Sequence, residues 1–286
     1  MLSSRVRDSR WTNAAVRGAV IATGAAVAVA GAGYHTRHVA PYRPVLERVD
    51  IRVPTGIETP PRLRIGFLAD THVGSVIRAA DVDRALALLL DAGPDLLLFG
   101  GDYVSESPRH ISDAAAVLGN VANTTRFGSL AVLGNHDYAN GAGRMTAALE
   151  DRGVRVLRND SACVGDESGE LWIAGLDDAL LGSADPQRAF AGVPSSARAI
   201  ALWHEPGWVE QVVPYGAFLQ LSGHSHGGQV RLPIVGPMAT PAGGRRFVEG
   251  LNIAAGMPIY TTRGVGVNRP PARFLCPPEV TLVTLV

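Results

Sequence analysis

Short apolar runs alternate with stretches of helical periodicity over residues 63–151, and each apolar run ends in polar residues. Runs of this length indicate buried strands, and apolar residues spaced by three or four indicate helices that pack on them. We therefore expect strands at 63–69, 96–99 and 129–133, and helices at 79–90, 110–121 and 143–151. The second half indicates further strands near 171–175, 198–202, 217–222, 258–262 and 280–285, with fewer helices and more loops.

The order strand, polar motif, helix, repeated along the chain, favours a layered α/β fold. In such folds the binding site lies at the carboxyl ends of the strands. A chain of 286 residues can hold one large domain or two small ones, and we expect one catalytic domain behind a short N-terminal extension. The extension and linker are expected at 1–45, and the catalytic domain at 46–286, entered through a short extended piece at 49–53.

The first fifty residues differ in kind from the rest. Four arginines precede a nearly uncharged run at 18–34, made mostly of Ala, Val, Gly and Ile: Arg5, Arg7, Arg10 and Arg17. This is the layout of a signal sequence or a short membrane anchor. The run is shorter than the roughly 20 residues that a spanning helix prefers. Ala28-Val29-Ala30 also offers a cleavage pattern, so anchoring, secretion after cleavage and an apolar cytosolic extension all stay open.

The arginines before this run favour an N-terminus inside the cell. The catalytic domain would then lie on the outer face of the cytoplasmic membrane, although Arg37, Arg43 and Arg48 after the run weaken that prediction. Residues 35–61 are expected to form a linker because they contain five prolines, Pro41, Pro44, Pro54, Pro60 and Pro61.

Composition and charge exclude some classes of function. Lysine plus arginine equals aspartate plus glutamate at 26 each, so no overall field attracts nucleic acid, and we expect no nucleic-acid partner. A hydrophobic fraction of 47% with 18% charged residues excludes a disordered chain. Cys163 and Cys276 lie far apart in no metal-binding spacing, and we expect both to be small buried side chains.

The polar residues at the strand ends supply the ligands that a pair of metal ions needs. A dinuclear site uses oxygen and imidazole ligands, with a carboxylate bridging two cations about 3.5–4 Å apart. Asp70 and His72 lie two residues apart, so in an extended segment both side chains leave the same side of the chain. Asp102 follows two glycines and can sit close between two ions. Asn135 offers a neutral carbonyl oxygen, which can hold a metal without adding negative charge near a bound phosphate.

Three histidines complete this set. His204 follows an apolar strand at 200–203, and His224 and His226 lie two apart within the sequence GHSHGG. Each motif alone has an ordinary structural interpretation: a chance pair, a turn, or a histidine at a strand end. Their occurrence together, each at the end of a strand, favours a metal site.

The series of motifs resembles the signature of the calcineurin-like metallophosphoesterase superfamily. It comprises Asp70-Thr71-His72, Gly101-Asp102, Gly134-Asn135-His136-Asp137, His204 and Gly223-His224-Ser225-His226. Four later segments resemble the bacterial membrane-associated phosphodiesterase subgroup: Gly227-Gly228-Gln229, Arg263-Gly264-Val265-Gly266, Arg273-Phe274 and Pro277-Pro278-Glu279. The resemblance implies a four-layer α/β/β/α sandwich with two mixed β-sheets and a site at one edge of both.

The resemblance also implies a role for each site residue. The first metal would be bound by Asp70, His72, Asp102 and His226, and the second by Asp102, Asn135, His204 and His224, with Asp102 bridging. His136 would protonate the leaving oxygen, with Asp137 orienting its ring. In many relatives the His204 motif continues through a proline to an acidic residue, whereas here Glu205 and Pro206 lead to Gly207.

The ligand types indicate the reaction but leave the metal and the substrate open. Oxygen and imidazole ligands suit two divalent ions of Mn, Fe, Zn, Ni or Co, which activate water for attack on phosphorus. We expect hydrolysis of a phosphoester, with a phosphodiester, including a lipid-linked one, as the first candidate. A phosphoprotein phosphatase and a non-catalytic metal-bound scaffold remain alternatives, and the oligomeric state stays open. Arg263 is expected to meet a substrate phosphate or pair with a carboxylate, and Tyr103 to line the pocket or pack.

Overall fold

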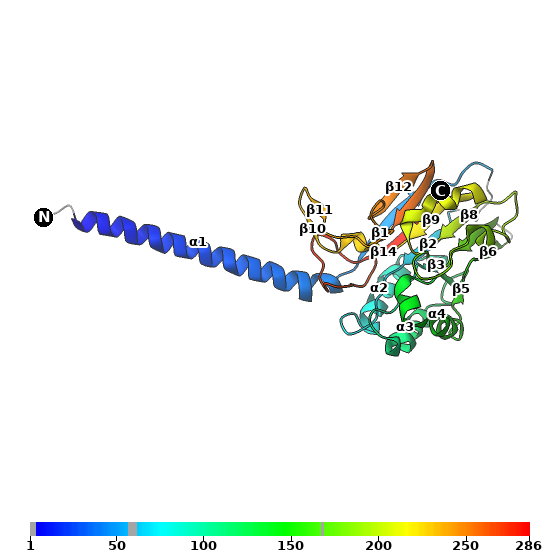
Figure 1. The fold of residues 1–286 in the computed structure, drawn as a ribbon, viewed down its shortest axis with the longest axis horizontal. Coiled ribbons are helices and arrows are strands. Elements are labelled where there is room, and N and C mark those ends of the chain that lie inside the picture. Colours follow the sequence, from blue (N-terminus) through cyan, green and yellow to red (C-terminus); the bar gives the residue numbers. More distant parts are fainter. Residues whose placement is uncertain (1–3, 57–61, 167–168) are drawn as a thin grey trace.

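Two six-stranded sheets lie face to face in the computed structural model, and a long helix extends away from them (Figure 1). The structure describes residues 4–56, 62–166 and 169–286. The first sheet has the order β1-β14-β2-β3-β4-β5. Its strands are β1 (Val45–Ile51), β14 (Glu279–Leu285), β2 (Arg64–Leu68), β3 (Leu96–Phe99), β4 (Ser129–Ala131) and β5 (Arg155–Val156).

Strands β2 to β5 run parallel, and three helices connect them: α2 (Ala79–Asp91), α3 (Ile111–Gly119) and α4 (Asn135–Glu150). Strand β14 lies antiparallel to β2 and parallel to β1. The sheet is therefore mixed, and the carboxyl ends of its parallel strands share one edge.

The second sheet has the order β12-β13-β9-β8-β7-β6 and is also mixed. Its strands are β12 (Gly250–Ala254), β13 (Met257–Thr261), β9 (Ala217–Ser222), β8 (Ala199–Leu202), β7 (Gly169–Gly175) and β6 (Asp160–Asp166). The central four run parallel, and β12 and β6 lie antiparallel at the edges. Short elements complete the chain: α5 (Pro186–Ala189), the 3₁₀ turns Ala40–Tyr42, Pro108–His110, Pro206–Gln211, Val213–Tyr215 and His226–Gly228, and the hairpin strands β10 (Arg231–Leu232) and β11 (Gly236–Pro237).

Three separate apolar cores show that these elements form four layers. Along β3, Leu97 and Phe99 pack towards α2, α3 and α4, whereas Leu96 and Leu98 pack into the core between the two sheets. This alternation follows from the period of two along a strand. A third core lies between the second sheet and an outer layer of short helices. The expected α/β/β/α sandwich with two mixed sheets is confirmed.

The N-terminal helix α1 (Ser4–His38) is 35 residues long. A segment of 27 residues within and just after it, Val16–Tyr42, is apolar and long enough to cross a membrane by length and composition. A membrane anchor and a signal sequence both have this character, and length and composition do not exclude an apolar cytosolic extension, so the three alternatives remain. The candidate span is longer than the uncharged run at 18–34 because the helix continues beyond it.

The boundaries of several elements differ from those expected. The linker expected at 35–61 is partly structured, since α1 runs to His38 and β1 already begins at Val45, while Pro60 and Pro61 lie outside the described residues. Helix α4 begins at Asn135 and not near residue 143. The predicted start lay too far along the chain because Gly141 interrupts the helical pattern, and its φ of 114° is indeed not helical. Cys276 is buried as predicted, but the prediction for Cys163 was wrong, since it is exposed on the edge strand β6.

Candidate metal centre

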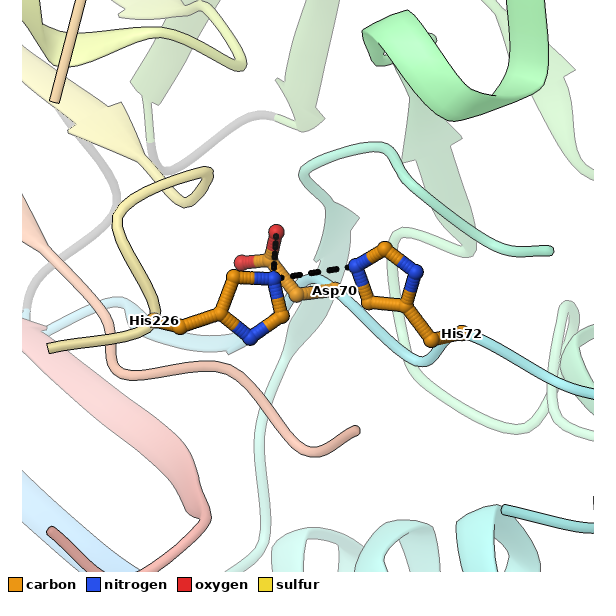
Figure 2. Close-up of side chains that lie close together, drawn as sticks. All are labelled: Asp70, His72 and His226. Atoms are coloured by element: carbon orange, nitrogen blue, oxygen red, sulfur yellow. Dashed lines mark hydrogen bonds and ion pairs between the residues drawn. The ribbon is translucent and has the colours of Figure 1, made fainter. Parts of the chain in front are cut away.

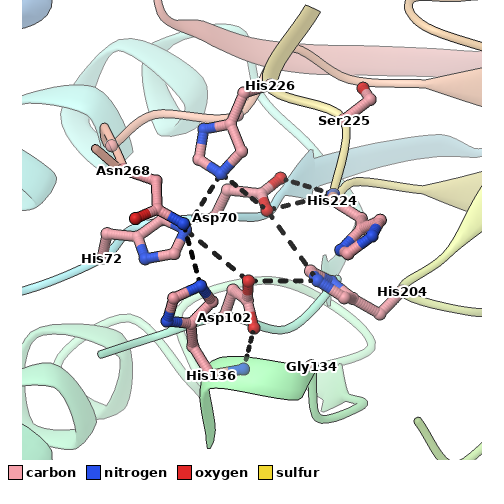
Figure 3. Close-up of polar contacts among 12 residues, drawn as sticks. Asp70, His72, Asp102, Gly134, His136, His204, His224, Ser225, His226 and Asn268 are labelled. Carbon is pink, nitrogen blue, oxygen red and sulfur yellow. Dashed lines mark hydrogen bonds and ion pairs between the residues drawn. The ribbon is translucent and has the colours of Figure 1, made fainter. Parts of the chain in front are cut away.

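Six of the seven predicted ligands come together at one edge of the two sheets, on the loops that follow the parallel strands (Figure 3), and the seventh, Asn135, lines the same cavity as Asp102 and His224. Asp70 and His72 follow β2, Asp102 follows β3, and Asn135 opens α4 after β4. From the second sheet, His204 follows β8, and His224 and His226 follow β9. The carboxyl ends of parallel strands meet at one edge, so residues distant in sequence can share one site.

Five of these residues have backbone conformations that are rare for side chains other than glycine. The φ angles of Asp70, His72, Asp102, His224 and His226 lie between 46° and 68°. Such left-handed conformations cost free energy and persist where surrounding contacts enforce them, often at functional sites. Here the loops after β2 and β3 support each other, since Asp70 N–H donates to Gly101 O at 2.9 Å and His72 N–H to Asp102 O at 3.0 Å.

Asp70, His72 and His226 form a first buried cluster (Figure 2). The Nε2 atoms of His72 and His226 lie 3.0 Å apart, and His226 Nε2 lies 3.5 Å from Asp70 Oδ1. Burial lowers the pKa of His72 to about 3 and, together with His72, holds the pKa of His226 well below its usual range. Both rings are therefore neutral, and each can offer a nitrogen lone pair to a cation between them.

Asp102, His204 and His224 form a second buried cluster, with ligand atoms within 4.8 Å of one another. His204 Nδ1 donates to Gly100 O at 2.6 Å, which turns Nε2 towards Asp102 Oδ2 at 3.2 Å. His224 Nε2 lies 2.7 Å from Ala242 O, so Nδ1 is the nitrogen left for a ligand. Burial lowers the pKa of His224 to about 4, so this ring is also neutral.

Asp102 lies between the two clusters. Its Oδ2 is 3.6 Å from His72 Nε2 and 3.2 Å from His204 Nε2, while Oδ1 accepts the N–H of His136 at 2.8 Å. Burial alone would raise the pKa of Asp102, but His204 and then His72 hold it well below its usual range. An ionised carboxylate in this position can bridge two cations.

Buried polar atoms without partners support the fit of these residues to metal ions. Within the described residues, Asn135 Oδ1 and the Nδ1 atoms of His72 and His226 are buried and have no hydrogen-bond partner. Buried polar groups without partners are costly, and a nearby bound ion is one of the explanations for them. Burial also raises the pKa of Asp70 to about 7. His204 opposes this shift in the pKa, and the nearby carboxylate of Asp102 adds to it. The donor set fits two divalent cations.

His136 lies beside this set at the wall of a cavity. Its Nδ1 is 3.2 Å from Ser105 O, its Nε2 is 2.9 Å from Asn268 Nδ2, and its ring meets that of His72 edge-on at 4.8 Å. The expectation that Asp137 orients this ring was wrong, because Ser105 O faces Nδ1 instead. Sequence reasoning missed Asn268, which no motif singled out.

Asp137 holds the backbone under Asp102. Its buried carboxylate accepts the N–H groups of Asp102 at 2.8 Å, Tyr103 at 2.9 Å and Gly134 at 3.0 Å. These bonds join the start of α4 to the loop after β3. Asp137 therefore positions the strand-end loop that carries Asp102.

The contacts of Arg263 and Tyr103 decide between the alternatives given for them, and those of Glu205 show its surroundings. Arg263 is paired with Glu47 at 2.6 Å and Glu279 at 2.9 Å, so the carboxylate alternative is confirmed. Tyr103 is buried and donates its hydroxyl to Val132 O at 2.6 Å, so it packs. Glu205 is buried, accepts the N–H of Ala179 at 3.2 Å, and has a pKa raised well above its usual range by burial and by Asp178.

Arg273 is a fully buried residue whose role the sequence did not reveal. Its guanidinium donates to the carbonyls of Arg263 at 2.8 Å, Gly264 at 2.9 Å, Gly266 at 2.6 Å and His226 at 3.3 Å. Arg273 thereby joins the glycine-rich loop after β13 to the loop that carries His226. A contact between residues so far apart in the sequence cannot be predicted from a local pattern.

A cavity of about 590 Å³ opens on the site. Asp102, Asn135, His136 and His224 form its polar end. The surface of its other walls is mostly apolar and includes Val230, Met238, Ala239, Pro241 and Pro270, and polar side chains such as Gln229, Asn268 and Arg269 lie among them. A ligand with a polar group at the metal ligands and an apolar remainder fits these surroundings.

Two buried clusters with Asp102 between them, at the edge of a four-layer α/β sandwich, are the arrangement of a metal-dependent hydrolase of the dinuclear type. The chain belongs to the calcineurin-like phosphoesterase family, whose model matches residues 63–228. It is thus a metal-dependent phosphoric ester hydrolase.

Proteins of known sequence extend this likeness over most of the chain. The metallophosphoesterase YkuE of Bacillus subtilis (strain 168) is 31% identical over 270 residues, which cover 93% of each chain. The phosphodiesterase YaeI of Escherichia coli (strain K12) is 35% identical over 231 residues, covering 78% of this chain and 82% of that one. A transmembrane protein with a metallophosphoesterase domain from Danio rerio is 29% identical, covering 83% of this chain and 56% of that one.

Proposed function

We propose that this chain hydrolyses phosphodiesters carried by lipids. The observation that carries the proposal is the cavity, whose polar end is formed by Asp102, Asn135 and His136 and whose walls are largely apolar. A phosphodiester has two organic substituents, so its site needs room for a second group beside the phosphate. The phosphodiesterase name of the similar YaeI supports the same choice.

In this proposal each site residue has one role. Asp70, His72 and His226 would hold one cation, His204, His224 and Asn135 would hold the other, and Asp102 would serve both. The cations would supply charge stabilisation at phosphorus and an activated water. Mn, Fe, Zn, Ni and Co all suit this donor set, and manganese or iron is our choice.

The residue that moves a proton is His136. Its Nδ1 lies near Ser105 O and its Nε2 faces the cavity, where Asn268 Nδ2 now contacts it. When substrate displaces that amide, the doubly protonated ring, whose Nδ1–H stays with Ser105 O, would give its Nε2 proton to the leaving oxygen, so that the leaving group departs as an alcohol and the ring is left neutral. Asp137 contributes by holding the backbone of Asp102.

The place of the reaction follows from α1. We propose that α1 anchors the chain and that residues 46–286 form the catalytic domain on the outer face of the cytoplasmic membrane, with cleavage and secretion as the alternative. Intact cells and inverted membrane vesicles treated with protease distinguish these arrangements. Digestion of the domain only in intact cells supports the proposal, digestion only in inverted vesicles contradicts it, and a shortened protein in the medium supports secretion.

The deciding experiment is metal analysis of the full chain in detergent, coupled to hydrolysis of a soluble phosphodiester and a matching phosphomonoester with added manganese. We expect about two metals per chain and preferential cleavage of the diester. The His136→Ala variant is the matched control, because it lacks the proton donor and keeps the proposed ligands. Preference for the monoester would favour a phosphatase, and two bound metals without turnover would favour a scaffold.

A further inference from the structure

The β10–β11 hairpin exposes large apolar side chains at its tip. Strands β10 and β11 pair through Arg231 with Pro237 and Leu232 with Gly236, and the turn between them spans 233–235. Leu232, Ile234, Val235 and Met238 are all exposed, and Leu275 on the neighbouring segment is exposed as well. Apolar side chains gathered in this way mark a surface that contacts a partner or a membrane.

The residue at the tip of this turn suits neither contact with water nor the backbone conformation found there. Ile234 is fully exposed and has φ 70°. A β-branched residue in this region is an outlier, since turn positions with positive φ normally carry glycine or asparagine. Neither turn chemistry nor solvation accounts for isoleucine here, whereas contact with an apolar phase does.

The hairpin lies beside the end of the membrane-span candidate. Val230 pairs with Phe274 in an isolated bridge, and Arg231 N–H donates to Phe274 O at 3.0 Å. The next residue back, Arg273, donates its N–H to Thr36 O of α1 at 2.9 Å. Figure 1 shows the hairpin on the side of the domain from which α1 leaves. A bilayer crossed by α1 would therefore lie near the hairpin tip.

The hairpin also forms part of the cavity wall. Val230 and Met238, joined by a hydrogen bond from Met238 N–H to Val230 O at 3.0 Å, both line the cavity. The base is fixed to the site, because Arg231 pairs with Glu249 at 2.5 Å and donates to Gly227 O at 3.2 Å. The exposed apolar tip thus continues from a base that lines the cavity, and this base is bonded to the loop that carries His226.

We propose that the tip of the β10–β11 hairpin inserts into the surface of a lipid bilayer and turns the mouth of the cavity towards it. Interfacial binding of this kind draws its free energy from buried apolar side chains, and α1 supplies a second attachment close by. The proposal rests on the proposed function only in taking the bilayer as the source of the substrate. A lipid whose head group carries the phosphodiester could then reach Asp102 and Asn135 along the apolar wall.

Insertion is tested by fluorescence quenching on the full chain reconstituted in vesicles of phosphatidylcholine and phosphatidylglycerol, with brominated acyl chains as the quencher. One label is placed on I234C in a C163S background, and the control label is placed on Cys163 of the native chain. Cys276 is buried and stays unlabelled, and β6, which carries Cys163, lies on the side of the domain away from α1 (Figure 1). We expect the label at position 234 to be quenched several-fold more than the label at Cys163. Equal quenching would overturn the proposal.

Ile234→Asp gives a second test with an intact fold, because aspartate accepts positive φ better than isoleucine. We expect unchanged hydrolysis of a soluble phosphodiester and about a tenfold loss on a fluorogenic phosphodiester lipid in vesicles, from the loss of an inserted apolar side chain. Loss of both activities, or of neither, would overturn the docking role. Sedimentation in detergent provides a further check, since a dimer that this substitution dissociates would make the hairpin a contact between copies instead.

The two proposals fail separately. If the native chain hydrolyses no phosphodiester while the label at position 234 is quenched, the proposed function is wrong and the docking surface stands. If soluble diester is hydrolysed and the two labels are quenched equally, the docking surface is wrong and the proposed function stands.

Discussion

Gly264 packs against the carboxylate side chain that opens the first metal cluster. Its φ is +66°, and a Cβ added there would lie 2.5 Å from Asp70 Cβ and 2.8 Å from Asp70 Oδ2. Neither distance is tolerated between non-bonded atoms, so alanine would have to push Asp70 aside. Gly250 offers a matched control, because its φ is +72° and, within the part of the chain that the structure describes, an added Cβ would meet nothing within 4 Å.

The two substitutions share one cost and differ in the other. Forcing alanine into a left-handed conformation costs about 1 kcal/mol or more at either position. Overpacking in a filled site adds about 1–3 kcal/mol at Gly264 only. We therefore expect Gly264→Ala to lower the free energy of unfolding by about 2–4 kcal/mol, against about 1 kcal/mol for Gly250→Ala.

Metal affinity should separate the two variants more clearly than stability. Displacement of Asp70 should weaken metal binding by about tenfold or more, the usual scale when the support of a ligand is disturbed. Gly250→Ala should bind metal as the native chain does. The assays are denaturant unfolding of the metal-free chain and titration with manganese. If the two variants matched in both measurements, the contact with Gly264 would not hold Asp70 in place.

Three further substitutions test the assigned roles. His136→Ala should retain both metals and lose about 10²–10⁴ in rate, measured by metal analysis and turnover, and a metal-free variant would make His136 a ligand. Asp102→Asn should lose metal and hydrolysis together, and full metal content with native turnover would remove Asp102 from the bridging position. Asp137→Asn should weaken metal binding because it disturbs the N–H contacts under Asp102. Native metal affinity with a changed pH profile of the rate would instead return Asp137 to the ring-orienting role.

The parts of the fold that could be predicted from the sequence are those with a local pattern. Strands β3 and β8 are unbroken apolar runs, β2 is buried after Arg64, and each strand is followed within three residues by a polar residue that reaches the site. Strand β6 was missed because it is an edge strand with mostly exposed residues and two aspartates, so it has no apolar run. The hairpin was missed because its two strands are only two residues long.

The site residues also fall into those that a local motif reveals and those that only the fold brings together. His72 and Asp102 could be found because each lies in a short motif at a strand end. The true contacts of Asp137 join it to Tyr103, 34 residues away, and those of Asn268 join it to His136, 132 residues away. Contacts between residues so distant in the sequence depend on how the two sheets pack together. The spacing of residues along the chain does not reveal this packing.

Arg273 links the metal loops to the end of α1, and this affects where the chain can be shortened. Its N–H donates to Thr36 O at 2.9 Å, and its guanidinium holds the carbonyls of Gly264 and His226. Tyr42 adds a second attachment through its hydroxyl, which lies 3.3 Å from Val76 O. A truncated chain that begins at residue 46 would remove both attachments together with the candidate membrane span. A soluble enzyme for metal and substrate studies should therefore keep Thr36 and the residues after it.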